Sequence, residues 1–275
     1  MKRLLAAYAL VMAVSGVAHG EPSVGVVAIQ TTPAVLKADR GYILMRVDES
    51  LSKLPPVSPV FQRKPLSSEV ADYEAAKKAA YDKDLQALTR RNDSAAIGKF
   101  PPLSAYPFSY WGHQNLFRVW RKQALASTNK AFTYLLEVEP TSYIVYGAAI
   151  SDHLDTCDCL GTVGFTVAPG VVTDIGTVLL DDAEPLSAIP ELASTTNMGR
   201  PYGDVVIASA IRPATTDTPV PPALAAMPRV FAKMHAAAPF VEPGADTISA
   251  MAPIPGVLHY EKGRLVDDVS GQVLR

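Results

Sequence analysis

The sequence has little of several features that identify a function. Only two of its 275 residues are cysteines, which excludes a disulfide-dense secreted scaffold. A net charge of −2 gives no electrostatic reason to expect a nucleic-acid partner. The chain contains no G-x-S-x-G elbow, Walker loop, G-x-G-x-x-G motif or H-E-x-x-H motif. We therefore expect a protein that is not an enzyme and that needs no cofactor.

Long apolar runs are also scarce, and the one near the N-terminus has the layout of an export signal. The basic pair Lys2-Arg3 precedes the apolar stretch Leu4–Val17, and small residues come just before Glu21. This order is typical of a cleavable secretory signal, and the stretch is shorter than the roughly 20 apolar residues that cross a bilayer. The alternative is an uncleaved N-terminal anchor. We expect residues 1–20 to be removed, which leaves a periplasmic or secreted protein without a transmembrane span.

Most of the remaining chain has the pattern of short strands. In Ala131–Val138 apolar residues alternate with more polar ones, and Tyr143–Tyr146 is rich in β-branched and aromatic residues. Val171–Leu180 follows a turn at Gly170 and contains Gly176, which indicates a bulge or a close approach. Other strand-like stretches are Val24–Ile29, Tyr42–Val47, Leu116–Trp120 and Val163–Val167. Short strands separated by turns predict a mainly β protein, an antiparallel β-sandwich over residues 21–182.

One segment interrupts the strand pattern. Glu69–Asp93 contains neither proline nor glycine. A narrow, mostly apolar stripe runs along this segment, with its members at spacings of three and four. They are Val70, Tyr73, Lys77, Tyr81, Leu85 and Leu88. This spacing predicts one inserted amphipathic helix, within residues 67–96. Such a helix is either a solvated cap over one sheet or an element that binds a partner.

Prolines concentrate in the last part of the chain. Residues 183–275 hold 12 of the 23 prolines. Each proline fixes φ and removes a backbone donor, so a continuous sheet is excluded there. We predict an extended Pro-rich C-terminal arm with short strands at Asp204–Ile211 and near Val257–Tyr260. The sequence Glu261–Arg264 indicates a turn that leads into a returning strand.

Two stretches carry a family resemblance, Val138–Tyr146 and Cys157–Gly176. They resemble uncharacterised exported proteins of proteobacteria built on a transthyretin-like or carboxypeptidase-regulatory-like β-sandwich. In those proteins a Pro-Gly-x-Tyr corner leads a strand, whereas this chain has Thr141-Ser142 between the proline and the tyrosine. Pro253–Tyr260 is similar to the tails of the same group. The resemblance implies the sandwich fold and implies no activity.

The densest cluster of reactive side chains is Asp152–Cys159. It contains His153, Cys157 and Cys159, and thiolates with an imidazole suit zinc or copper. Cys157 and Cys159 would share one face of a strand. The alternatives are a strained and therefore labile Cys157–Cys159 disulfide, or two small buried hydrophobic residues. A metal-binding or thiol-redox protein is thus one alternative function, with a metal as its cofactor.

A run of aromatic residues, Tyr106–Trp111, supports another alternative. Tyr110 and Trp111 in this run, with Trp120 further on, could stack on sugars in a carbohydrate-binding module. The other interpretation is that these rings fill the core or pack a loop. The interpretation that we favour is an exported, non-catalytic sandwich of the cell envelope that binds another protein or a surface component.

Overall fold

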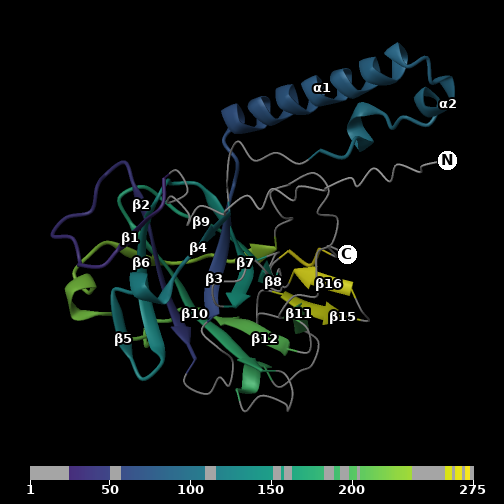
Figure 1. Cartoon of the computed structure of the whole chain (residues 1–275). Coiled ribbons are helices and arrows are strands. Elements are labelled where there is room, and N and C mark those ends of the chain that lie inside the picture. The colour runs from purple at the N-terminus through teal and green to yellow at the C-terminus, as the bar shows by residue number, and fades with distance from the viewer. Residues whose placement is uncertain are drawn as a thin grey trace, which may run out of the picture.

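The chain folds into two stacked β-sheets from which one long helix projects (Figure 1). The computed structural model describes residues 25–49, 57–108, 116–150, 156–157, 163–182, 189–192, 198–202, 205–236, 258–261, 264–267 and 270–272. The expected signal at residues 1–20 lies outside these ranges. The prediction of a mainly β sandwich with one inserted helix is confirmed.

The larger sheet, sheet A, has eight strands, and six of them form its main path. In spatial order these are β1 (Val27–Ile29), β6 (Ala131–Val138), β2 (Gly41–Asp48), β10 (Val172–Asp182), β12 (Val205–Arg212) and β11 (Met198–Tyr202). Two more strands, β5 (Ala126–Thr128) and β13 (Arg229–Phe231), pair with β6 and β10. The pairings of β10 with β2 and with β13 are parallel and the others in this sheet are antiparallel, so sheet A is mixed. The prediction that all strands pair antiparallel is therefore wrong for these two pairs, because β10 pairs with strands that are distant in the sequence.

The second sheet, sheet B, has six strands, all paired antiparallel. Its path is β14 (His235–Ala236), β9 (Val163–Thr166), β7 (Ser142–Ile150), β3 (Val57–Arg63) and β4 (Leu116–Arg118), and β8 (Thr156–Cys157) pairs with β7. A separate hairpin consists of β15 (Leu258–Glu261) and β16 (Arg264–Asp267), which confirms the turn predicted near Glu261.

The helical elements comprise one long helix and several single turns. The α-helices are α1 (Ser67–Arg90) and α2 (Ser94–Ile97). The 3-10 turns are η1 (Leu103–Ala105), η2 (Arg121–Gln123), η3 (Pro190–Leu192) and η4 (Pro222–Leu224). α1 begins where the sequence pattern places the insertion, but it extends away from the sheets instead of covering one of them (Figure 1).

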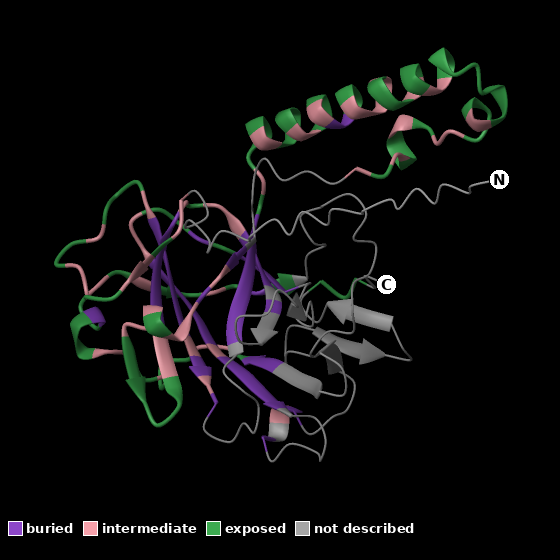
Figure 2. Cartoon of the chain, in the orientation of Figure 1, coloured by how far each residue is buried: buried purple, intermediate pink, exposed green. Residues whose placement is uncertain are grey.

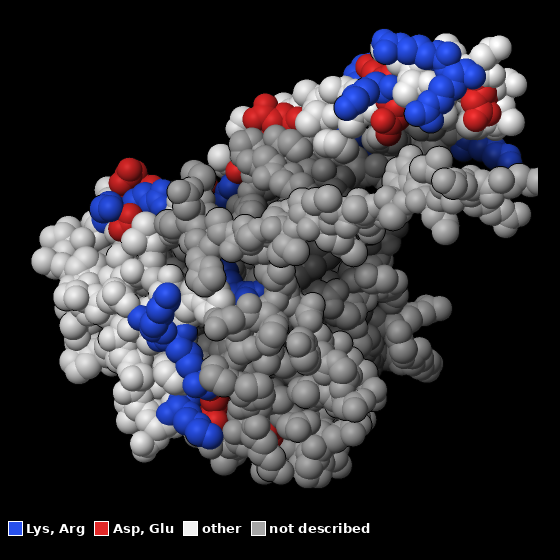
Figure 3. All heavy atoms as spheres, viewed as in Figure 1, with Lys and Arg blue, Asp and Glu red and all other residues white. Residues whose placement is uncertain are grey.

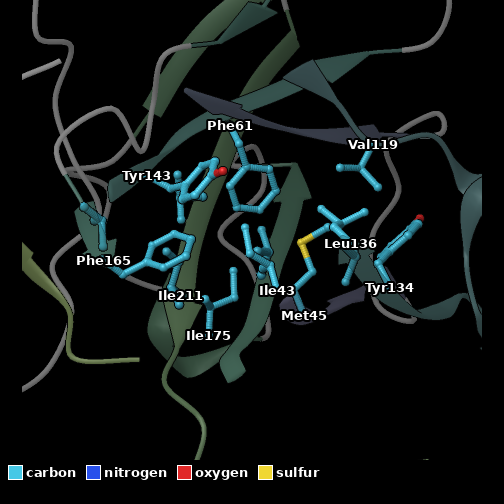
Figure 4. Packing of buried hydrophobic residues seen from close by; sticks show 14 of the residues in the cluster. Ile43, Met45, Phe61, Val119, Tyr134, Leu136, Tyr143, Phe165, Ile175 and Ile211 are labelled. Atoms are coloured by element: carbon cyan, nitrogen blue, oxygen red, sulfur yellow. The ribbon is translucent and has the colours of Figure 1, made fainter. Parts of the chain in front are cut away.

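The hydrophobic core lies between the two sheets (Figure 4). Sheet A contributes side chains such as Ile43 and Met45, which are fully buried. Four neighbouring strands of sheet B each contribute one aromatic ring, and these rings are Phe61, Phe117, Tyr143 and Phe165. Their centroids lie 5.3–6.4 Å apart in stacked and edge-to-face pairs. These ring contacts connect four adjacent strands of sheet B within the hydrophobic core.

A second, smaller core covers the outer face of sheet A. Its buried members are Tyr42, Leu44, Leu135, Val172 and Leu224. Because β2 packs on both faces, its residues 41–45 are all buried, and the strand lacks the polar–apolar alternation of a half-exposed strand. Figure 2 shows this central region in purple and α1 mostly in green and pink.

Two glycines behave as the sequence predicts. Gly170 ends the Pro-Gly turn with a φ of +69°, where glycine has no steric penalty. Gly176 has a φ of +93° and sits at the register shift between β10 and β2. A Cβ atom on Gly176 would lie 2.1 Å from the carbonyl oxygen of Arg212. The expected bulge and the expected close approach therefore occur at the same residue.

The described part of the proline-rich arm joins the sandwich. β12 and β13 extend sheet A, and β14 extends sheet B. Leu224, which lies between them in η4, is buried in the outer core of sheet A. Prolines separate these short strands, as predicted, and residues 205–236 are a part of both sheets and not a free arm.

Candidate functional site

The feature that stands out from the sandwich is the helical segment formed by residues 67–108, here called the projection. α1 and α2 lie within it, and Phe108 is its last residue. α1 is about 36 Å long at 1.5 Å per residue. It ends where Asn92 adopts a φ of +54°, and the carboxylate of Asp93 then accepts a hydrogen bond from the Ala96 amide at 2.9 Å to start α2.

The projection is inserted between two adjacent strands. β3 leads into it, β4 follows it, and Gln62 is paired with Leu116 across the two strands. The entry and the exit of the insertion therefore lie side by side. The projection is an enlarged hairpin loop, and sheet B does not depend on it for its strand order.

A buried ion pair joins the projection to the sandwich. Arg63, the last residue of β3, has a side chain that is only 4% exposed. Its guanidinium lies 2.5 Å from a carboxylate oxygen of Glu69 and 3.4 Å from one of Glu139. The other oxygen of Glu69 accepts a hydrogen bond from the Leu66 amide at 2.6 Å, which caps the first turn of α1. These contacts set the direction in which α1 leaves the sheet.

One face of α1 is covered by the returning segment of the projection. Tyr81 packs against Phe100 and Tyr106 at centroid distances of 5.1 and 5.4 Å, and Tyr73 packs against Phe108 at 5.6 Å. The hydroxyl of Tyr106 donates to a carboxylate oxygen of Asp84 at 2.6 Å, and this bond raises the pKa of Tyr106. The predicted stripe therefore packs within the projection.

The opposite face of α1 is exposed and strongly charged (Figure 3). Basic side chains gather over the outer part of the projection, with acidic ones among them. Lys78 forms an i,i+4 ion pair with Asp82 at 2.6 Å, and the two side chains are 63% and 45% exposed. Exposed apolar side chains are found at the base and near the far end, namely Leu66, Val70 and Ile97. Among its described residues, this face brings together no set of catalytic groups.

Of the three residues expected to bind sugars, the structure describes only Trp120. Tyr110 and Trp111 lie outside the described residues, whereas Tyr106 and Phe108 from the same run pack on α1. Trp120 is half-buried, and the Arg118 guanidinium lies over its ring at 5.1 Å.

Trp120 is also remote from the projection. It follows Val119, whose amide donates to the carbonyl of Pro59 at 2.9 Å. Trp120 therefore lies near the first residues of β3, whereas the projection begins after the last residue of β3. Among the described residues, Trp120 and the aromatic residues of the projection belong to different surfaces.

The residues expected to bind a metal or form a disulfide are largely outside the described part. His153 and Cys159 fall in the undescribed ranges, and for Cys157 only the backbone is described, in β8 beside Ala148 of β7. Among the described residues, no group of three His, Cys, Asp or Glu side chains is placed to hold a metal ion. The metal and disulfide hypotheses stay predictions.

Sequence reasoning missed the buried charges of sheet A. Asp174 in β10 is fully buried, and both its oxygens accept hydrogen bonds from Arg46 of β2, at 2.7 and 3.0 Å. Arg229 of β13 donates to the same carboxylate at 3.0 Å. A second buried carboxylate, Glu137, pairs with Lys37 at 2.8 Å, which raises the pKa of Lys37. These groups are satisfied by one another, so they stabilise strand order and are no candidate site.

Comparisons with protein-family models, with curated proteins and with solved structures give no match. No helix within the described residues has the length and apolar character needed to cross a membrane. The projection is therefore assigned as the candidate site from its geometry alone.

Proposed function

We propose that this chain is an exported, non-catalytic β-sandwich protein of the cell envelope that binds another protein through the projection. The sandwich is the scaffold, and the exposed face of α1 is the binding surface. The partner is another envelope protein or a surface component, and the protein is periplasmic or secreted.

One observation carries the proposal. No residue from 67 to 108 belongs to either described core cluster, although this segment includes the longest helix of the described chain. Ordering a 24-residue helix costs conformational entropy, and this helix does not offset that cost by packing in the core. Binding residues are commonly carried on segments that a rigid scaffold holds in solvent. A recognition role accounts for a helix that packs only within its own insertion and contributes nothing to the two described core clusters.

Export is supported by sequence alone. A basic pair, an apolar stretch and small residues before Glu21 form the pattern of a secretory signal. The resemblance to exported proteobacterial sandwiches points the same way. The Pro-Gly-x-Tyr corner of those proteins corresponds here to Pro140–Tyr143, in which Thr141 stands in the place of the glycine.

Site-specific photo-crosslinking in the producing cell tests the proposal. A photo-reactive residue is placed at position 78 on the exposed face of α1, and in a matched control at position 130, which is exposed in the turn before β6. We expect position 78 to capture a defined protein that position 130 does not capture. Equal capture at both positions, or none at position 78, would show that the projection is not the binding element.

A further inference from the structure

One buried charged side chain of this protein has no partner among the described residues. In the described part of the chain six charged residues are buried, and five of them interact with another group. These five are Glu49, Arg63, Glu137, Asp174 and Asp181. The sixth is Lys77 of α1, which is 6% exposed and forms no hydrogen bond or ion pair with a described residue. Lysine is almost never buried unless it is paired, so Lys77 needs a specific explanation.

Aromatic rings border Lys77 along the covered face of α1. Tyr73 lies one helical turn before it and Tyr81 one turn after it, on the same face of the helix. Phe108 packs on the ring of Tyr73, and Tyr106 packs on the ring of Tyr81. The short segment between Tyr106 and Phe108 therefore crosses α1 at the level of Lys77. The rings enclose the aliphatic stem of the lysine, which accounts for its burial.

The acidic side chains near Lys77 on α1 leave it unpaired. Asp84 accepts the hydrogen bond of the Tyr106 hydroxyl at 2.6 Å, and Asp82 pairs with Lys78. Glu74 is exposed and forms no ion pair with Lys77. The ammonium nitrogen of Lys77 is not among the unpaired polar atoms that the described residues enclose completely. It therefore reaches solvent at the end of a buried stem, where an anion can approach it.

We infer that Lys77 binds a carboxylate of the partner protein, an aspartate or glutamate side chain that enters between the two pairs of rings; the inference rests on the proposed function of the projection. The charge of the projection favours one anionic group over a polyanion. Residues 67–108 contain six basic and six acidic residues, so their net charge is zero. Nucleic acids and other polyanions are bound by a surplus of basic side chains, which is lacking here.

Substitution of Lys77 tests the role of its charge. The measurement is the yield of the protein captured from position 78 in the producing cell. We expect Lys77→Met to lower this yield at least about tenfold, because the partner's carboxylate then has no cation beside it. Lys77→Arg should retain most of the yield. Lys233→Met removes an exposed lysine of the sandwich and is the matched control, which should capture like the unaltered chain.

Carbodiimide coupling tests the contact itself. This reagent joins a lysine amine to a carboxylate with loss of water and adds no spacer, so it links only groups that are in contact. After capture at position 78, we expect mass spectrometry to find an amide between Lys77 and an aspartate or glutamate of the captured protein. In Lys77→Arg the capture should persist and this amide should be absent, because the reagent does not couple a guanidinium.

Thermal unfolding separates binding from a role in folding. Lys77→Met should unfold at nearly the same temperature as the unaltered chain, because methionine fills the space of the buried stem and needs no partner. A large loss of thermal stability in this variant would overturn the inference, since Lys77 would then hold the projection together.

Two further results would overturn the inference and leave the proposed function standing. One is equal capture from position 78 by Lys77→Met and by the unaltered chain. The other is an amide from Lys77 to a carboxylate of its own chain and to none of the captured protein. If position 78 of the unaltered chain captures no protein, the proposed function fails, and the inference fails with it.

Discussion

The hydroxyl of Tyr143 donates a hydrogen bond to the carbonyl oxygen of Glu139, four residues earlier, at 2.7 Å. Pro140-Thr141-Ser142 forms the corner between these two residues, so the bond closes the turn from β6 into β7. A tyrosine that bonds back to the backbone in this way is typical of β-sandwiches with Greek-key connections. Burial raises the pKa of Tyr143, so its hydroxyl is neutral and can donate throughout the physiological range.

Tyr143→Phe should therefore weaken the sandwich. The variant keeps the buried ring and loses the hydrogen bond, which costs about 1–2 kcal/mol of the free energy of unfolding. Urea unfolding followed by tryptophan fluorescence measures this loss. Tyr106→Phe removes a hydroxyl from the projection and should change the unfolding of the sandwich by under about 0.5 kcal/mol. Equal effects of the two substitutions would show that the corner bond has no special role.

The buried carboxylate of Asp174 gives a larger effect. Asp174→Asn leaves the guanidinium groups of Arg46 and Arg229 without the negative charge that neutralises them. Removing one partner of a buried ion pair costs about 3–5 kcal/mol. Thermal unfolding should shift strongly for this variant and very little for Asp217→Asn, which changes an exposed carboxylate. A loss below about 1 kcal/mol would mean that the cluster does not hold β13 on sheet A.

Gly176 should not tolerate a side chain. In Gly176→Ala the new Cβ meets the Arg212 carbonyl oxygen and the backbone of residues 213–214, and the φ of +93° is strained for alanine. We expect a loss of more than about 3 kcal/mol or no folded protein. Gly271→Ala has nothing within 4 Å of the added Cβ and a φ of +69°, so it should cost about 1 kcal/mol or less. A folded Gly176→Ala with unchanged stability contradicts the observed register of β10 and β12.

Stability should fall at high pH because Tyr134 is buried. Desolvation raises the pKa of Tyr134 from its ordinary value of 10 to about 12. Between these values the tyrosine loses its proton in the unfolded chain but keeps it in the folded one. Its contribution to stability is therefore complete below pH 10 and is lost as the pH rises toward 12. The decline measured by urea unfolding should be shallower in Tyr134→Phe, and an identical decline in both proteins would contradict this assignment.

Local patterns were enough to predict many of the strands. β6 matches its predicted range because its alternation is set by the pleat of a strand, which neighbouring residues reveal. Gly176 was found because a glycine inside an apolar run needs a local reason. By contrast, β3 was missed, because Pro59, Gln62 and Arg63 interrupt its pattern and are buried through contacts made elsewhere in the chain.

Non-local features could not be predicted. Asp174 is 128 residues from Arg46 and 55 from Arg229, so its burial depends on the parallel pairing of β10 with β2 and with β13. A parallel neighbour leaves no turn signal between the two strands. For the candidate site, the sequence predicted the helix and its stripe. It could not indicate that Phe100, Tyr106 and Phe108 cover that stripe, which left the direction of α1 open.

The most direct test of the account removes the projection and asks what is lost. Because Gln62 pairs with Leu116, a short Gly-Ser turn can replace residues 66–113 and join β3 to β4 as a simple hairpin. We expect a sandwich that still folds cooperatively, with a lower unfolding temperature because Arg63 keeps Glu139 but loses Glu69. This shortened chain should no longer capture the protein crosslinked at position 78 of the full chain, wherever on its surface a photo-reactive residue is placed. Capture of that same protein by the shortened chain would contradict the account, because the binding surface would then lie on the sandwich.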